Sequence, residues 1–139
     1  MRIVTYLNTT EEEIFAKKFN IVVGISLGNK DFKRELVRSY LLWAIENTKE
    51  KVLVLIPDKI HSVNYEIKNG YKKERACKLS AREGKKVEEM VKDILDEFTP
   101  EKRSIVQYQN GNKLKRMNIN EWSQFSMTSL KIMRSLIMK

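Results

Sequence analysis

The segment Ile21-Val22-Val23-Gly24-Ile25-Ser26 decides how the rest of the chain can fold. It is a short apolar run, rich in β-branched residues, that leads into glycine-containing sequence, and such a run is typical of a buried strand in a parallel sheet. A second run of this kind extends from Lys51 to Ile56 and is followed by Pro57, which cannot continue a strand ladder. We therefore expect two buried strands, the first of them in a central position.

The sequence between these two runs predicts an amphipathic helix from Asp31 to Thr48. Asp31 can cap its start. The apolar residues that recur at close to helical spacing are Phe32, Leu36, Tyr40, Leu41, Trp43, Ala44 and Ile45. A strand, a helix and a strand in succession form a βαβ unit, whose strands are parallel and whose crossover is right-handed.

Two further helices are expected after the second strand. A short one runs from Ile60 to Lys68 and is broken by Asn69-Gly70. A longer one runs from Tyr71 to Phe98, with Gly84 as a weak point, and Pro100 ends it. Its apolar stripe consists of Ala76, Leu79, Val87, Met90, Val91, Ile94 and Leu95.

The C-terminal part predicts a third strand from Ser104 to Gln109. Asn110-Gly111 could then close a hairpin onto residues 113–117, because this residue pair favours tight turns. A last helix is expected from about Asn120, with an apolar face between Trp122 and Ile137 that needs a partner. The fold class is α/β.

Composition favours one domain of residues 1–139 in the cytoplasm. The chain has 42% apolar and 32% charged residues, and no apolar run approaches the roughly 20 residues that a membrane span needs. Glu11, Glu12 and Glu13 interrupt the region where a signal peptide would be apolar. The single cysteine, Cys77, excludes an intramolecular disulfide and a cysteine-based zinc site.

The net charge of +9 is unevenly distributed. Residues 1–70 hold 11 basic and 9 acidic side chains, whereas residues 101–139 hold 8 and 2. This asymmetry favours a polyanionic partner, because Lys and Arg that neutralise phosphates release condensed counterions. A solvated surface that only aids solubility is the alternative, and composition does not separate the two.

The loop from Gly24 to Asn29 carries the chemical signal. It follows the first strand at the sheet edge where ligands bind in open α/β folds, so Ser26 would be exposed to substrate. Gly24 allows close approach of a substrate backbone, and Gly28 allows a turn that a side chain would hinder. Asn29 can hold the turn or orient an acyl carbonyl. The alternative is a tight connection in which Ser26 only forms a local hydrogen bond.

Gly24-x-Ser26-x-Gly28 also matches the nucleophile elbow of α/β-hydrolases, which requires a downstream acid and a histidine. His61 is the only histidine, and Asp58 precedes it, but both directly follow the second strand. The chain is also short for that fold. We disfavour this interpretation and expect His61 to be a surface or capping residue and Cys77 a small apolar filler.

Five sequence blocks together resemble the cyclodipeptide synthase family. They occur in the family's order over about residues 20–95 and read V-G-I-S-L-G-N at Val23 to Asn29, Asp31-Phe32, L-L-W-A at Leu41 to Ala44, V-L-V-L-I-P-D at Val52 to Asp58, and N-G-Y-K-K-E-R-A at Asn69 to Ala76. The resemblance implies a Rossmann-like fold similar to the catalytic domains of class I tyrosyl- and tryptophanyl-tRNA synthetases. It also implies a reaction that needs neither ATP nor metal and makes a cyclic dipeptide from two aminoacyl-tRNAs.

Carried onto this chain, the resemblance implies that Ser26 is the nucleophile that accepts the aminoacyl group and that Asn29 assists it. The implied substrate pocket consists of Gly24, Leu27, Gly28 and Gly70. The family's basic, tRNA-binding helix matches residues 71–92. The cations there fall at spacings that bring them onto one helix face, and they are Lys72, Arg75, Lys78, Arg82, Lys85 and Lys86. The alternative is an ordinary solvated face on which glutamates are interspersed.

The chain departs from the family in its C-terminal part, where a Tyr-x-x-x-Glu-x-Pro motif would supply the groups that bind and deprotonate the substrate amine. No Tyr-x-x-x-Glu occurs, and Glu121 is the only acid after Glu101. Three interpretations remain. The first is a truncated or half-size relative that binds charged tRNA and forms an acyl-serine. The second is a sheet completed by a second copy or by another chain, which the apolar face from Trp122 to Ile137 would favour, and the third is a basic Rossmann-like tRNA-binding module without catalysis.

Overall fold

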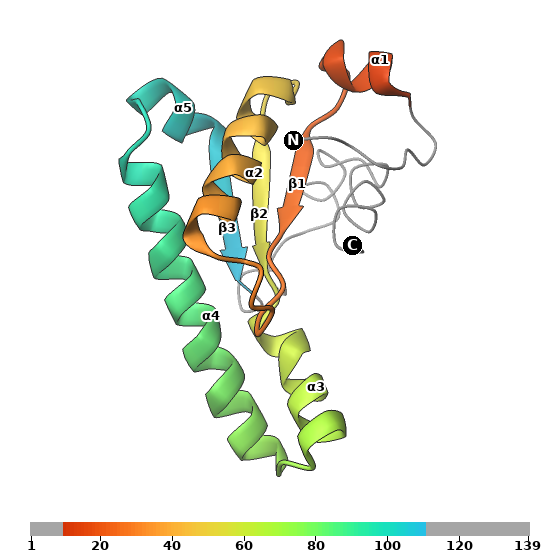
Figure 1. Cartoon of the computed structure of the whole chain (residues 1–139), viewed down its shortest axis with the longest axis vertical. Helices are drawn as coiled ribbons and strands as arrows, with labels where there is room; N and C mark the ends of the chain where they lie inside the picture. The colour runs from red at the N-terminus through yellow and green to blue at the C-terminus, as the bar shows by residue number, and fades with distance from the viewer. Residues whose placement is uncertain (1–9, 111–139) are drawn as a thin grey trace.

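A parallel sheet of three strands forms the centre of the computed structural model, which describes residues 10–110 (Figure 1). The strands β1 (Ile21–Gly24), β2 (Val52–Ile56) and β3 (Val106–Asn110) lie in the order β1-β2-β3. Both pairings are parallel. The α/β class and the parallel βαβ unit are confirmed. Among the described strands, however, β2 and not β1 has the middle position, because β3 pairs with the far edge of β2.

The crossover helix α2 (Arg34–Asn47) connects β1 to β2. Its N-cap is Lys33, which makes no side-chain capping bond, so the expected cap at Asp31 is wrong. The Asn29 side chain explains the difference, because its Oδ1 accepts a hydrogen bond from the Asp31 N–H at 3.0 Å. Asp31 is thereby held in a turn before the helix.

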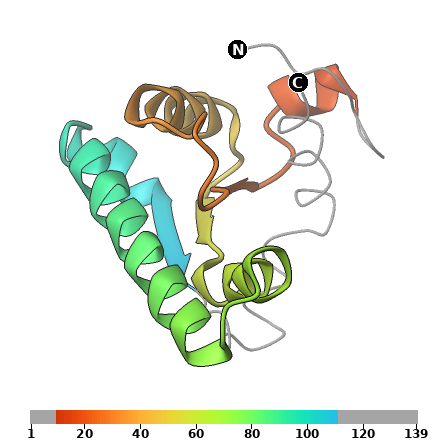
Figure 2. The same cartoon turned by 60° about the horizontal axis from the view of Figure 1, so that its bottom comes forward.

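The main core lies between one face of the sheet and the helices α2 and α4 (Figures 1 and 2). Its sheet side includes Val23 and Val54, and its helix side includes Leu41 and Ile94. Side chains alternate along a strand, so the neighbours of these strand residues point to the other face. There Val22 and Leu53 form a separate buried cluster.

A helical hairpin extends past the carboxyl ends of the strands (Figure 1). α3 (Asp58–Asn69) begins two residues after β2 and ends at Gly70, which has a φ of 63° and caps the helix in the left-handed conformation. α4 (Lys73–Asp96) then returns along α3 and continues beside the sheet. Since a helix rises about 1.5 Å per residue, α4 is roughly 36 Å long.

The apolar stripe expected on α4 is present, and two small residues extend it. Val91, Ile94 and Leu95 are buried as predicted, but so are Ser80 and Gly84. Gly84 is therefore a close-packing position against Asp58 of α3, a role that its expected weakness inside the helix did not indicate.

Two short helices complete the described chain. α1 (Glu11–Phe15) precedes β1, and α5 (Pro100–Ile105) precedes β3. Pro100 does not end α4, which stops at Asp96, but lies in the first turn of α5, where its missing N–H is not needed. The expectations for residues 113–117, for the last helix and for a homodimer through it lie outside the described residues. Within residues 10–110, no helix combines the length and apolar character that a membrane crossing requires.

Candidate functional site

Ser26 lies two residues beyond the end of β1, at the carboxyl edge of the sheet. The Ile25 N–H donates to the Leu55 carbonyl at 3.0 Å and so extends the strand ladder to the residue before Ser26. Ile25 and Leu27 are buried, whereas Ser26 between them is half-buried. The Ser26 hydroxyl forms no hydrogen bond with any residue from 10 to 110. The alternative of a serine tied down locally therefore finds no support in the part of the chain that the structure describes.

The loop after Ser26 is shaped by Gly28 and Asn29. Gly28 has a φ of 74°, a conformation that side chains rarely adopt, so the expected turn is present. Asn29 accepts from the Asp31 N–H through its side chain and from the Phe32 N–H through its carbonyl, at 3.0 and 3.2 Å. Asn29 therefore holds the turn, which is the first of the two roles expected for it.

The implied pocket residues are not all brought together. Gly24 is the last residue of β1 and comes two residues before Ser26. Leu27 is only 3% exposed and is therefore part of the core rather than of an open pocket wall. Gly70 lies at the opposite end of α3, roughly 18 Å from the sheet edge for a helix of this length. Its observed role is to cap α3, and the structure does not bring it near the loop.

The six cations expected to bind RNA are all exposed. Five of them lie on the side of α4 away from its buried residues, as their spacing predicted, and Lys72 is the N-cap residue that precedes the helix. Arg82 and Lys86 lie 3.5 and 3.2 Å from the Glu83 carboxylate, and Lys85 lies 3.9 Å from Glu89. Such exposed pairs are weak and rearrange readily.

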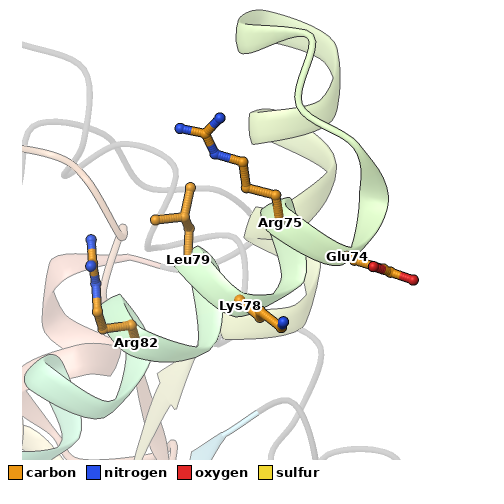
Figure 3. Close-up of a pocket in the computed structure, with 5 residues that line it drawn as sticks. All are labelled: Glu74, Arg75, Lys78, Leu79 and Arg82. Atoms are coloured by element: carbon orange, nitrogen blue, oxygen red, sulfur yellow. The ribbon is translucent and has the colours of Figure 1, made fainter.

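The start of α4 differs from this paired part. Among residues 10–110, no carboxylate lies within 4.0 Å of the charged groups of Lys72, Arg75 or Lys78. An open pocket of about 420 Å³ follows this part of the helix. Figure 3 shows Arg75, Leu79 and Arg82 projecting to the same side of α4, with Glu74 pointing away from them.

His61 contributes to the site in a way that the sequence analysis missed. A Cβ built on Gly28 would lie 3.5 Å from His61 Nε2, so the imidazole packs against the turn that follows Ser26. Burial, and secondarily the positive charge of Lys68, lower the pKa of His61 below its ordinary value of 6.5. His61 is partly exposed, as expected of a surface residue, but its contact with the Gly28 turn was not expected. His61 follows the second strand closely in sequence, at the edge of the sheet where ligands bind, and this position could have indicated that it lies near the site.

Cys77 also differs from expectation, because it is exposed on α4 and does not fill apolar space. Within residues 10–110, no three His, Cys, Asp or Glu side chains are grouped so that they could hold a metal ion.

The parallel sheet, the helical crossover and the loop at the carboxyl edge define a Rossmann-like α/β protein. Residues 4–124 match the family model for cyclodipeptide synthase, and the chain belongs to this family. No curated protein sequence matches the chain.

Two solved structures show the same fold. The first is a Mycobacterium tuberculosis protein whose structure is described as demonstrating that cyclodipeptide synthetases are related to type I tRNA synthetases; the TM-score is 0.62 and the identity 20%, over 76% of this chain and 46% of that one. The second is the cyclodipeptide synthase of Staphylococcus haemolyticus, with a TM-score of 0.55 and 18% identity over 92% of this chain and 65% of that one. The chain thus spans 46% and 65% of the lengths of these proteins.

Proposed function

We propose that this chain accepts an aminoacyl group from charged tRNA on Ser26, as the first step of cyclodipeptide synthesis. The observation that carries the proposal is the half-buried Ser26 at the carboxyl edge of the sheet, whose hydroxyl has no hydrogen-bond partner among residues 10–110. Family membership supports it, because the match to the family model spans residues 4–124 and so includes the loop that contains this serine.

The proposed transfer exchanges one ester for another. The Ser26 Oγ attacks the acyl carbonyl carbon, the bond from that carbon to the terminal ribose oxygen breaks, and the serine proton ends on the ribose hydroxyl. Because the ester of charged tRNA is already activated, the step needs no ATP, and a positioned hydroxyl can accept the acyl group. Asn29 Oδ1 is engaged in the turn, so its Nδ2 is the group that would orient the acyl carbonyl. The amine of a second aminoacyl-tRNA would then attack the acyl carbon of the acyl-serine, which breaks its bond to Ser26 Oγ and returns a proton to that oxygen. The free amine of the resulting dipeptidyl-tRNA would attack the remaining ester, so that ring closure releases the cyclic dipeptide and the second tRNA.

The exposed face of α4 is the proposed tRNA contact. Its cations would neutralise phosphates of the acceptor arm and release counterions. Charged tRNA is a cytoplasmic substrate, so the proposal assigns the protein to the cytoplasm.

Covalent labelling of intact protein tests the proposal. The protein is incubated with tRNA that carries a radiolabelled amino acid, and denatured protein is examined for bound label and for the matching mass increase. We expect label on the wild type and on Ser104→Ala, an exposed serine in α5, but none on Ser26→Ala. Label of undiminished strength on Ser26→Ala would refute the assignment of the nucleophile.

A second candidate function is tRNA binding without acyl transfer. It is favoured by the start of α4, where Arg75 and Lys78 have no carboxylate within 4.0 Å among the described residues. Mobility shifts separate the two candidates. Retention of tRNA without label on the wild type, abolished by Arg75→Glu and Arg82→Glu, would support the binding module.

A further inference from the structure

Three aromatic rings form a row along α3, starting at the loop that contains Ser26. The row begins with His61, whose ring packs against Gly28. Tyr65 follows one helical turn later, with its ring centroid 4.9 Å from that of His61 and the two planes at 89°. Tyr71 continues the row beyond the end of α3, stacked on Tyr65 at 6.4 Å and 21°. The row therefore runs from the candidate nucleophile loop to the tip of the hairpin.

The Arg75 side chain contacts the far end of this row. The guanidinium carbon of Arg75 lies 4.2 Å from the centroid of the Tyr71 ring, which is close for a cation–π contact. No carboxylate within the described part of the chain lies within 4.0 Å of Arg75. Its charge is therefore available to an anionic ligand that also contacts the rings.

The rings do not belong to the apolar core. All three are half-buried, and none is part of the core cluster between the sheet and its helices. The buried face of α3 consists of Asp58 and Ser62. His61 and Tyr65 lie next to that face on α3, and both rings, like that of Tyr71, are partly exposed. Aromatic rings that stay partly open to solvent are suited to a flat, aromatic ligand.

A hydrogen bond at the near end of the row indicates which ring nitrogen of neutral His61 carries the proton. The amide Nδ2 of Asn64 lies 3.3 Å from His61 Nδ1, and an amide nitrogen can only donate, so Nδ1 accepts. In the neutral imidazole the proton is then on Nε2, the atom that lies near Gly28. The near end therefore offers a ring edge and an N–H donor beside the Ser26 loop.

We propose that His61, Tyr65, Tyr71 and Arg75 form a binding site for unpaired nucleotides, and that its ligand is the single-stranded 3′ end of tRNA. Unpaired bases expose faces that stack on aromatic rings, while paired bases in a duplex do not, and a neighbouring arginine binds the phosphates. A strand bound along the row would extend from the start of α4, at Arg75, to the loop that contains Ser26. The inference rests on the proposed function, since it names the part of the tRNA that the same site would hold.

Two tRNA probes test the site, one with its complete 3′ end and one lacking the unpaired 3′ nucleotides. The variants are Tyr65→Leu and Tyr71→Leu, which keep apolar bulk without a ring, and Tyr65→Phe and Tyr71→Phe, which keep the ring. Ile67→Ala is the matched control, because Ile67 is also on α3 but is 77% exposed on another face. We expect each leucine variant to bind complete tRNA about tenfold more weakly, since stacking on one ring is worth about that factor. The phenylalanine variants and Ile67→Ala should bind like the wild type.

The tRNA without its unpaired 3′ nucleotides shows whether the leucine variants lose contacts to that end. This trimmed tRNA should bind the wild type more weakly than complete tRNA does, and its affinity should be the same for the leucine variants as for the wild type. Equal losses with both probes, or no loss with complete tRNA, would overturn the site. A fluorescent 2-aminopurine at the 3′ terminus of the tRNA gives a second measurement that needs only the wild type: stacking should quench its emission, and unchanged emission in the bound state would also overturn the site.

The outcomes also separate this inference from the proposed function. Ser26 labelling together with leucine variants that bind both probes normally would overturn only the aromatic site. Ring-dependent binding of complete tRNA without label on Ser26 would overturn only the acyl transfer. A wild type that binds neither probe would overturn both.

Discussion

Gly84 on α4 and Asp58 at the start of α3 approach so closely that a Cβ added to Gly84 would lie 2.6 Å from the Cβ of Asp58. One helical turn earlier, the Ser80 hydroxyl donates a hydrogen bond to the Asp58 backbone carbonyl. These two contacts fix where α4 crosses α3, directly beyond the end of β2. The position of the hairpin, and with it the cations and the aromatic row, depends on them.

Gly84→Ala should destabilise the protein. At an exposed helix position alanine is more favourable than glycine by about 1 kcal/mol. Here the added methyl group meets Asp58, and overpacking of this kind costs about 1–3 kcal/mol. Urea unfolding followed by circular dichroism measures the change. Lys85→Ala, at the exposed neighbouring position, should change stability by less than about 0.5 kcal/mol. A more stable Gly84→Ala would show that the helices can move apart without cost.

Ser80→Ala should also destabilise the protein, by about 1–3 kcal/mol, because it removes the donor to a buried carbonyl. Ser80 is 1% exposed, so water cannot readily replace the lost hydroxyl. The same unfolding measurement on Ser104→Ala, an exposed serine whose hydroxyl donates to the Glu101 carbonyl at 2.7 Å, provides the comparison. Equal effects of the two substitutions would contradict the importance of the α3–α4 contact.

Glu97 should titrate at a lower pH than an ordinary glutamate. Hydrogen bonds from Arg34 at 2.6 Å and from Arg38 at 3.0 Å lower the pKa of its carboxyl group below 4.5. Because the folded-state pKa is the lower one, the contribution to stability is present above pH 4.5 and is lost as the pH falls through the folded-state pKa. Carboxyl-group NMR should show a midpoint below 4.5 that rises in Arg34→Met. An ordinary midpoint in the wild type would mean that the two arginines do not bind Glu97 in solution.

His61 should remain neutral at pH 7. Burial against the loop, aided by Lys68, lowers the pKa of its imidazole below 6.5. The associated stability is therefore present above pH 6.5 and is lost as the pH falls through the folded-state pKa. NMR titration of the ring protons measures the midpoint, which Lys68→Ala should raise slightly. A midpoint above 6.5 would argue against the packing of this ring on Gly28.

Binding of tRNA should depend on salt through the cations of α4. Each phosphate contact that Arg75→Glu or Arg82→Glu removes should lower the slope of log affinity against log salt by about 1. Lys18→Glu is the control, since Lys18 follows α1 and lies 3.5 Å from Glu13. Filter binding at several salt concentrations gives the slopes. If all three variants have the same slope, general charge and not the α4 face accounts for the affinity.

Local features of the fold could be predicted from local sequence. The apolar β-branched runs that became β1 and β2 need no distant partner to be recognised, and the 3.6-residue period of α4 identified Val91, Ile94 and Leu95 as buried. The positive φ values of Gly28 and Gly70 follow from turn chemistry that is encoded in one or two residues.

The candidate site was only partly predictable, because it combines segments that are distant in the chain. Ser26 and Asn29 are adjacent in sequence, so their loop could be recognised, whereas the contact of His61 with Gly28 exists only because α3 begins next to the end of β1. Asp31 illustrates the same limit on a smaller scale, since a neighbouring side chain holds it in a turn and moves the helix start to Arg34.

The order of residues alone was sufficient for the strands, the main helices, the serine loop and the exposed line of cations, because backbone preference and hydrophobic periodicity act over a few neighbouring residues. Folding in three dimensions decided that β2 lies between β1 and β3, that Gly84 must have no side chain, and that His61 faces the loop of Ser26. Such relationships depend on how closely whole helices and strands pack against one another, and this distance cannot be predicted from any short stretch of sequence.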